Sequence, residues 1–411
     1  MSTAEVPARV RLGPRPLPLH LMMASTTWLS SLDALPLARS GSLAWKGDLA
    51  TEAVALAPAL ASAPPEALLA ALGDEARRRL ALYLDGIVAY RAHSYRRRLA
   101  DPPVLWEEGT TRLLDYQPRG APKAAALFVP SLINRAYILD LAPGRSLMRW
   151  LADAGIRCFL LDWAAPSEAE RGFSLDDYIL GRLAGALDAA VEAQGGPVVL
   201  LGYCMGGLLA LPIALRAPDK VSALSLLATP WDFAADGGVQ RGLLMAHRDA
   251  LARVIELFGV LPTDVIQGLF AGLDPLLAAR KFLRFATLDP NSDAARAFVA
   301  LEDWLNDGVP LAGPVARDCL FGWYDENRPG RGAFRVGGEP IRPEHIRKPS
   351  LVVIPADDRI VPPPSAEALA TSIPGALAWR PSLGHIGMIA SPRAATALHQ
   401  PLARWIIDAA K

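Results

Sequence analysis

A cysteine, an aspartate and a histidine stand in this chain in an order and setting that allow nucleophilic chemistry. The stretch LGYCMGG places Cys204 at the centre of a G-x-C-x-G motif, after the apolar run PVVLL and before LLALPIAL. A buried strand that turns sharply into a helix presents a nucleophile on a strained elbow, where only small neighbours fit. Gly202, Gly206 and Gly207 meet that requirement. Because the start of such a helix favours a thiolate, we expect Cys204 to be the nucleophile.

The base and its partner acid follow Cys204 along the chain, which is the order nucleophile, acid, histidine of an α/β-hydrolase. PADDRIVPP places Asp357 and Asp358 directly after one apolar strand, and SLGHIGMI places His385 in a glycine-flanked loop after the next. His385 is therefore predicted to take the thiol proton while a carboxylate orients the imidazole. The D-x-I-V-P pattern favours Asp358 as that carboxylate, and Asp357 is expected to cap the turn.

An oxyanion formed during acyl transfer needs two backbone N–H donors beside the nucleophile. The first is expected from Met205, the residue after Cys204. The second is expected from the loop VPSLINR, at Ser131 or Leu132.

A thiol in place of the usual serine hydroxyl indicates chemistry in which a thioester is the donor or an intermediate. Transfer from an acyl-CoA to Cys204 exchanges one thioester for another, so the acyl group stays activated for attack by an alcohol. The pattern favours a condensing acyltransferase in which His385 deprotonates first the thiol and then the hydroxyl. A lid that excludes water would protect the ester product.

The elements that position these residues alternate between strand and helix from about residue 104, which predicts a mostly parallel sheet flanked by helices. An insertion at about 232–346, after the sixth strand, is helical and loop-rich and is predicted to form the lid. We expect a helical N-terminal region at 1–100 and a catalytic domain of the α/β-hydrolase fold at 101–411. Expected strands lie at VLWEEG, TRLLDY, ALFVP, RCFLLDW, PVVLLGY, VSALSLLAT, SLVVIPA and ALAWRP.

Composition narrows the classes of function. The 411 residues carry 42 Lys plus Arg and 42 Asp plus Glu, which gives no bulk charge to attract nucleic acid. Three cysteines cannot form a disulfide framework, which suits a cytoplasmic protein. We expect no spanning helix, no metal site and no nucleotide cofactor, since no apolar run, ligand cluster or phosphate loop has the required spacing.

One helix of the N-terminal region is expected to be amphipathic. Residues 66–99 place apolar side chains at steps of three and four, and the opposite face is basic, with seven arginines: Arg77, Arg78, Arg79, Arg91, Arg96, Arg97 and Arg98. The helix either packs on the main domain with a solvated charged face or offers a surface to a partner, an anionic granule or a membrane.

Several ordered motifs from about residue 104 onward resemble the polyhydroxyalkanoate (poly-3-hydroxybutyrate) synthases of the α/β-hydrolase superfamily. They are VPSLINRAYILDLAPGRSLMRWL, FLLDW, SLDDYI, LGYCMGG, ATPWDF, WYDEN, PADDRIVPP and SLGHIGMI. The resemblance implies a triad of Cys204, Asp358 and His385, 3-hydroxyacyl-CoA as substrate, and a polyester and free CoA as products. It also implies a homodimer or a partner synthase subunit at a granule surface.

Two other functions stay open on the sequence alone. The first is a cysteine-dependent hydrolase of the same fold, such as a thioesterase, a polyester depolymerase or a protein similar to dienelactone hydrolases. The second is a non-catalytic, granule-associated subunit. The fate of the acyl group, polymer or free acid, separates the first of these from the synthase.

Overall fold

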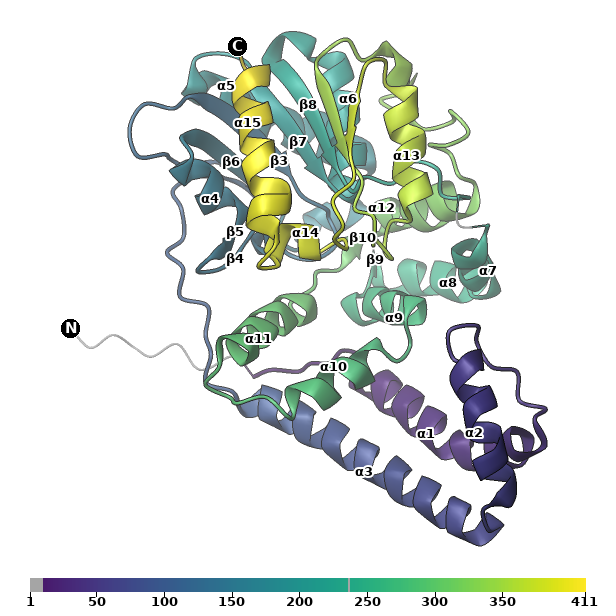
Figure 1. Ribbon diagram of the computed structural model, residues 1–411. Coiled ribbons are helices and arrows are strands. Elements are labelled where there is room, and N and C mark those ends of the chain that lie inside the picture. The colour runs from purple at the N-terminus through teal and green to yellow at the C-terminus, as the bar shows by residue number, and fades with distance from the viewer. Residues whose placement is uncertain (1–9, 236) are drawn as a thin grey trace. The chain divides into compact units, whose positions relative to one another are not determined.

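The computed structural model describes residues 10–235 and 237–411, which form two compact units (Figure 1). The α/β unit contains Arg96–Ile266 and Asp307–Lys411. The helical unit contains the described residues up to Tyr95 together with Gln267–Asn306. Residues 267–306 therefore group with the N-terminal helices, although the sequence analysis assigned them to the insertion of the catalytic domain. The domain boundaries and the role of the insertion as a lid stay predictions.

The α/β unit is built on one eight-stranded sheet with the order β1-β2-β6-β3-β7-β8-β13-β14. Only the pairs β1–β2 and β2–β6 are antiparallel, and all other neighbours are parallel. The strands are β1 (Val104–Glu108), β2 (Thr111–Tyr116), β3 (Ala124–Val129), β6 (Ile156–Asp162), β7 (Val198–Tyr203), β8 (Val221–Leu227), β13 (Ser350–Val353) and β14 (Leu377–Trp379). Every residue of β3 and β7 is buried, as expected for central strands covered on both faces. The predicted fold class is confirmed.

Helices connect the strands and cover the sheet. α6 (Met205–Arg216) follows β7 directly, and nearly all of its residues are buried. α15 (Gln400–Ala409) crosses the sheet on the near side in Figure 1 and contacts β3 and β8. The other connecting helices are α4 (Leu147–Asp153), the π-helical turn η3 (Asp177–Leu183), α5 (Ala184–Gln194), α13 (Pro363–Ser372) and α14 (Gly387–Ala390).

The predicted insertion is mainly helical, as expected. Its helices in the α/β unit include α7 (Val239–Ala246), α8 (Arg248–Phe258), α12 (Gly313–Arg317) and the π-helical segment η5 (Asp318–Asp325). A short two-stranded sheet pairs β9 (Val260–Leu261) with β10 (Leu311–Ala312), and α9 (Thr263–Leu273) leads into the helical unit.

The helical unit has an aromatic core formed by two segments that are far apart in the sequence. Its helices are α1 (Leu17–Ser40), α2 (Ala50–Ser62), α3 (Pro65–Ala92), α10 (Leu277–Phe285) and α11 (Asp293–Asn306). The rings of Tyr83 and Tyr90 on α3 pack edge to face against Phe282 on α10. A Cβ at Gly86 would lie 2.2 Å from the backbone oxygen of Phe282, so the close packing of these two helices depends on that glycine.

Helix α3 ends at Ala92, so the expectation of helix as far as Leu99 is wrong. The backbone is extended at His93, and the Arg11 guanidinium donates hydrogen bonds to the carbonyl oxygens of His93 and Tyr95. In a continuing helix these carbonyls would accept from the next turn. A long-range side chain therefore replaces the local hydrogen bonds, which periodicity does not reveal.

The predicted basic face of α3 is largely paired within the chain. Arg78 and Arg79 both form ion pairs with Glu75, at 2.7 Å each, and Arg77 pairs with Asp74 at 2.5 Å. These pairs are exposed and each adds little to stability, but they cancel much of the positive charge on this face.

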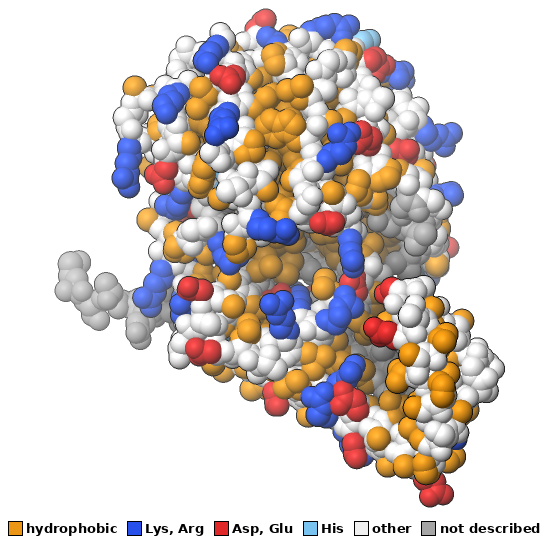
Figure 2. Space-filling view, in the orientation of Figure 1, with side chains coloured by type: hydrophobic (Ala, Val, Ile, Leu, Met, Phe, Trp, Pro, Cys, Tyr) orange, Lys and Arg blue, Asp and Glu red, His pale blue; other side chains and the backbone are white. Residues whose placement is uncertain are grey.

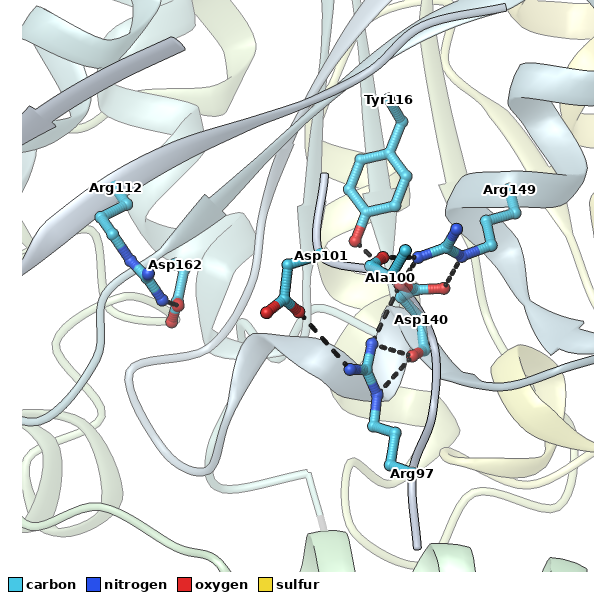
Figure 3. A network of polar contacts seen from close by, with 8 residues as sticks. All are labelled: Arg97, Ala100, Asp101, Arg112, Tyr116, Asp140, Arg149 and Asp162. Atoms are coloured by element: carbon cyan, nitrogen blue, oxygen red, sulfur yellow. Dashed lines mark hydrogen bonds and ion pairs between the residues drawn. The ribbon is translucent and has the colours of Figure 1, made fainter. Parts of the chain in front are cut away.

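A buried carboxylate holds together three parts of the α/β unit (Figure 3). Asp140 is fully buried and forms ion pairs with Arg149 of α4 at 2.8 Å and with Arg97 at 3.0 Å. The hydroxyl of Tyr116 on β2 donates a hydrogen bond to the same carboxylate at 3.1 Å. Burial and the Asp140 charge raise the pKa of Tyr116 above its ordinary value, so this hydroxyl remains a donor. These contacts fix the position of Asp140, which lies five residues after the end of the VPSLINR loop.

The surface of the helical unit is unusually apolar over α2, as Figure 2 shows. None of the residues of α2 is buried, and Val54 and Leu56 are 75% and 55% exposed. Its segment ATEAVALAPALAS contains one charged residue, Glu52. On the same view, charges of both signs are mixed over the α/β unit.

Candidate active site

Cys204 lies on a strained turn between β7 and α6. Its backbone has φ 55° and ψ −128°, a conformation that side chains other than glycine rarely adopt. The Cys204 N–H donates to the carbonyl of Leu227 at 2.8 Å, so the neighbouring strand β8 holds the turn in place. Strain of this kind persists only where the surrounding structure enforces it, and it is typical of nucleophile elbows.

The glycines around Cys204 are required because the backbone approaches closely there. A Cβ at Gly206 would lie 2.0 Å from the carbonyl oxygen of Val129, and one at Gly202 would lie 2.3 Å from the Cα of Gly207. Both contacts are with backbone atoms, which cannot rotate away as a side chain can. The turn therefore packs directly against the end of β3.

We expect Gly206→Ala to destabilise the protein by about 3 kcal/mol or more, because the end of β3 or the elbow must move to admit the methyl group. Gly181→Ala is the matched control, since a Cβ there meets no heavy atom within 4 Å. That helical substitution should leave stability unchanged or raise it by about 0.5–1 kcal/mol. Chemical denaturation of both variants measures the difference, and equal stabilities would contradict the packing argument.

His385 and Asp358 form a buried pair at the ends of the last strands. The Nδ1 of His385 lies 2.7 Å from Oδ2 of Asp358, and the two residues are 7% and 5% exposed. The other carboxylate oxygen, Oδ1, accepts hydrogen bonds from the N–H groups of Ile360 and Val361, at 2.9 Å each. Asp357 is exposed instead. Of the two aspartates, the structure thus brings Asp358 to His385.

The charge state of His385 depends on Cys204. Burial of the imidazole would lower its pKa, but the negative charge of Cys204 and the hydrogen bonds to Asp358 and Cys204 outweigh burial and raise the pKa of His385 to about 10. With Asp358 fixing Nδ1, the other ring nitrogen is left for the sulfur. The geometry therefore places the His385 imidazole where it can exchange a proton with the Cys204 sulfur.

We expect the imidazole of His385 to remain protonated at pH 8, because its raised pKa keeps the proton bound until the pH approaches about 10. NMR titration of protein with labelled histidine measures this, and the signal is assigned by its loss in His385→Gln. In Cys204→Ala the pKa should fall, since the negative sulfur is gone. A wild-type His385 that titrates near the ordinary value of 6.5 would contradict the ion pair.

The residues expected to bind an oxyanion lie at the start of α6 and in the loop after β3. Met205 is the first residue of α6, and neither its N–H nor that of Ser131 donates a hydrogen bond to any residue that the structure describes. The Ser131 hydroxyl accepts from the N–H of Ile133 at 3.0 Å, which shapes the loop after β3. A small apolar recess adjoins this loop and is lined in part by Leu132, Ala164 and Tyr178.

The described part of the chain contains neither a metal-binding cluster nor a membrane-spanning helix. Among residues 10–235 and 237–411, no three His, Cys, Asp or Glu side chains are grouped so that they could hold a metal ion. Every helix in those ranges is too short or too polar to span a bilayer.

Comparisons with known proteins identify the family. The profile of the α/β hydrolase fold matches residues 137–389. The chain is 31% identical over 311 residues to the poly(3-hydroxyalkanoate) polymerase subunit PhaC of Allochromatium vinosum, which covers 74% of this chain and 87% of that protein. The chain belongs to the poly(3-hydroxyalkanoate) polymerase family. The family expected from the motifs is therefore confirmed.

Other relatives show how the polymerase family varies in length. The PhaC subunit of Haloferax mediterranei is 29% identical over 311 residues, which cover 74% of this chain but only 63% of that protein. Among solved structures, the monoacylglycerol lipase of Paleococcus ferrophilus aligns with 73% of this chain and 99% of its own at 18% identity and a TM-score of 0.47.

The structure of this polymerase family member reveals two contacts that the sequence analysis missed. The Tyr203 hydroxyl donates to the carbonyl of His385 at 3.2 Å, and the two rings lie 5.2 Å apart. The indole Nε1 of Trp163 donates to the carbonyl of Pro130 at 2.9 Å. Tyr203 belongs to the motif LGYCMGG and Trp163 to the motif FLLDW. The partner of each side chain lies in a loop that follows another strand of the sheet. The only sequence signal for these two contacts was that Tyr203 and Trp163 lie within motifs shared with the family.

Proposed function

We propose that the chain is a polyhydroxyalkanoate synthase-like acyltransferase that polymerises 3-hydroxyacyl-CoA through a thioester on Cys204, with release of CoA. The observation that carries the proposal is the constellation of Cys204 on a strained elbow and the buried pair of His385 and Asp358. Membership of the polymerase family supplies the substrate class. No metal or nucleotide takes part, and coenzyme A enters only as part of the substrate.

The first half-reaction loads the enzyme. The Cys204 thiolate attacks the thioester carbonyl, and the N–H groups of Met205 and of Ser131 or Leu132 stabilise the oxyanion. The bond from the carbonyl carbon to the CoA sulfur breaks, and the His385 imidazolium gives its proton to the departing thiolate. The products are an acyl thioester on Cys204 and free CoA.

The second half-reaction extends the polyester. The neutral His385 removes the proton of a 3-hydroxyl group, and the oxygen attacks the acyl thioester on Cys204. The carbon–sulfur bond breaks, an ester forms, and the thiolate and imidazolium pair is restored. Asp358 holds the ring in one orientation throughout and stabilises its positive form.

The proposal extends to the surroundings of the enzyme. The relatives are named as polymerase subunits. We propose that this chain likewise acts as a homodimer or together with a partner synthase subunit. The exposed apolar face of α2, with its single charge, supports contact with the surface of a polyester granule. The single charge on α2 is the negative Glu52, which does not favour contact with an anionic surface.

The test incubates the full chain with 3-hydroxybutyryl-CoA and follows thiol release, insoluble polyester and free 3-hydroxybutyrate. Thiol release with polyester is the expected result. Thiol release with free acid alone would make the protein a thioesterase, and the polymerase proposal would be wrong. Absence of thiol release with this substrate, with longer acyl chains and with an added synthase subunit would favour a non-catalytic, granule-associated subunit.

A further inference from the structure

The indole of Trp163 donates a hydrogen bond to the loop after β3, which is expected to supply the second oxyanion donor. The residue follows β6 and is 4% exposed. Its Nε1–H donates to the carbonyl of Pro130, at a distance of 2.9 Å between the two heavy atoms. Pro130 is the residue after β3 and directly precedes Ser131, one of the two candidates for the second donor. A buried indole N–H needs such a partner, and the partner here belongs to the VPSLINR loop.

The indole is held rigidly in this place. The turn after β6 is closed by the N–H of Ala164, which donates to Asp162 at 3.1 Å, and Ala164 takes a positive φ of 55°. Arg112 in turn pairs with Asp162 at 2.8 Å (Figure 3). The ring of Tyr178 packs edge to face on Trp163 with centroids 5.6 Å apart. A side chain fixed by backbone, ion pair and ring contacts can itself fix a neighbour.

The hydrogen bond to Pro130 orients the next N–H. A peptide unit is planar, and the described cis bonds are confined to Gly13–Pro14 and Arg15–Pro16, so the bond from Pro130 to Ser131 is trans. In a trans peptide the C=O and N–H point in opposite directions. Since Trp163 holds the carbonyl of Pro130, the N–H of Ser131 must point away from the indole.

This peptide also lies against the elbow. A Cβ built at Gly206 would be 2.8 Å from both the carbonyl carbon and the oxygen of Pro130. Gly206 is two residues after Cys204 and one after Met205, the other expected donor. The Pro130–Ser131 peptide therefore borders the start of α6, where the oxyanion of a Cys204 adduct must form.

We propose that Trp163 is a positioning residue for the oxyanion site, and that the N–H it orients, that of Ser131 rather than Leu132, is the second donor. The inference rests on the proposed acyl transfer at Cys204 and names the group that aligns its oxyanion site. Loss of the indole N–H frees the peptide to rotate, and the donor is then no longer in place before the reaction begins.

The test compares two reactions of Cys204 in Trp163→Phe. Acylation by 4-nitrophenyl butyrate and by 3-hydroxybutyryl-CoA passes through an oxyanion, whereas alkylation by iodoacetamide needs the thiolate but forms no oxyanion. We expect the acylation rate to fall at least about tenfold with little change in KM, since an oxyanion donor is worth about 10²–10³ in rate. Alkylation should stay within twofold of wild type.

Trp323→Phe is the matched control because Trp323 is buried and packs on the rings of Phe233 and Phe334, and its indole N–H makes no hydrogen bond to a residue that the structure describes. It should leave both reactions unchanged. If Trp163→Phe does not fold, 3-benzothienylalanine at position 163 replaces only the N–H by sulfur and keeps the ring shape. Unchanged acylation in a folded variant, or an equal loss of acylation and alkylation, would overturn the inference.

The two substrates separate this inference from the proposed function. If the wild-type enzyme reacts with 4-nitrophenyl butyrate but not with any 3-hydroxyacyl-CoA, the polymerase proposal fails while the role of Trp163 can still be measured on the ester. If both substrates react and only the Trp163 variants behave like wild type, the positioning role fails and the polymerase proposal stands.

Discussion

Cys204→Ala is expected to abolish acyl transfer, with a loss of at least about 10⁴-fold, because removal of a nucleophile leaves no covalent route. Neither thiol release from 3-hydroxybutyryl-CoA nor polyester should be detected above the uncatalysed rate. The fold should survive, since the side chain is only partly buried and alanine is small. Intact-mass measurement after incubation with substrate would show an acyl adduct on the wild-type chain and none on the variant.

Cys319→Ala is the control for this experiment. Cys319 is buried, and burial raises the pKa of its thiol well above the ordinary value, so it is neither accessible nor nucleophilic. That variant should keep both the activity and the acyl adduct. Polyester formation by Cys204→Ala at a rate near that of the wild type would contradict the proposed mechanism.

His385→Gln is expected to lower acyl transfer by about 10²–10⁴-fold, because the group that moves protons in both half-reactions is lost. Unlike Trp163→Phe, this variant should also slow the alkylation of Cys204 by iodoacetamide at neutral pH. The reason is that the raised pKa of His385 reflects a mutual attraction between the imidazolium and the Cys204 sulfur. Without His385, the Cys204 sulfur loses the ring nitrogen that is hydrogen-bonded to it and can take its proton.

His345→Gln provides a matched control, since His345 is exposed and no part of the site. It should match wild type in acyl transfer and in alkylation. Equal alkylation rates for wild type and His385→Gln would mean that His385 does not hold the thiolate. A general base acting later in the cycle would then be its only remaining role.

Much of this arrangement could be predicted from the sequence because it depends on local patterns. Short apolar runs between turn residues predicted all eight strands of the sheet, and the fold that they form is confirmed. The elbow could be placed because glycine is needed wherever two backbones approach closely, as at Gly206. The positions of Asp358 and His385 followed from the rule that functional groups extend from the carboxyl ends of parallel strands. Their catalytic roles stay predictions.

The rest depends on contacts between distant segments, which leave no periodic signal. No sequence pattern near Pro130 predicts that its carbonyl accepts a hydrogen bond from the indole of Trp163. The end of α3 at Ala92 is set by Arg11, whose guanidinium binds carbonyls about eighty residues away along the chain. Local propensity would have continued the helix, and a tertiary hydrogen bond overrode it.

The divided core of the helical unit has a consequence for the synthesis of the protein. Tyr83 and Tyr90 leave the ribosome before the stretch 96–266, but they gain their packing partner Phe282 only after that whole stretch has been translated. At about 5–20 residues per second this delay is on the order of ten seconds or more. During that interval α1 and α3 expose an aromatic surface while six strands of the sheet, β1, β2, β3, β6, β7 and β8, are being made. Helices α1 and α3 are thus made before most of the sheet but complete their core only after it, which makes their exposed aromatic surface a point of contact for a chaperone.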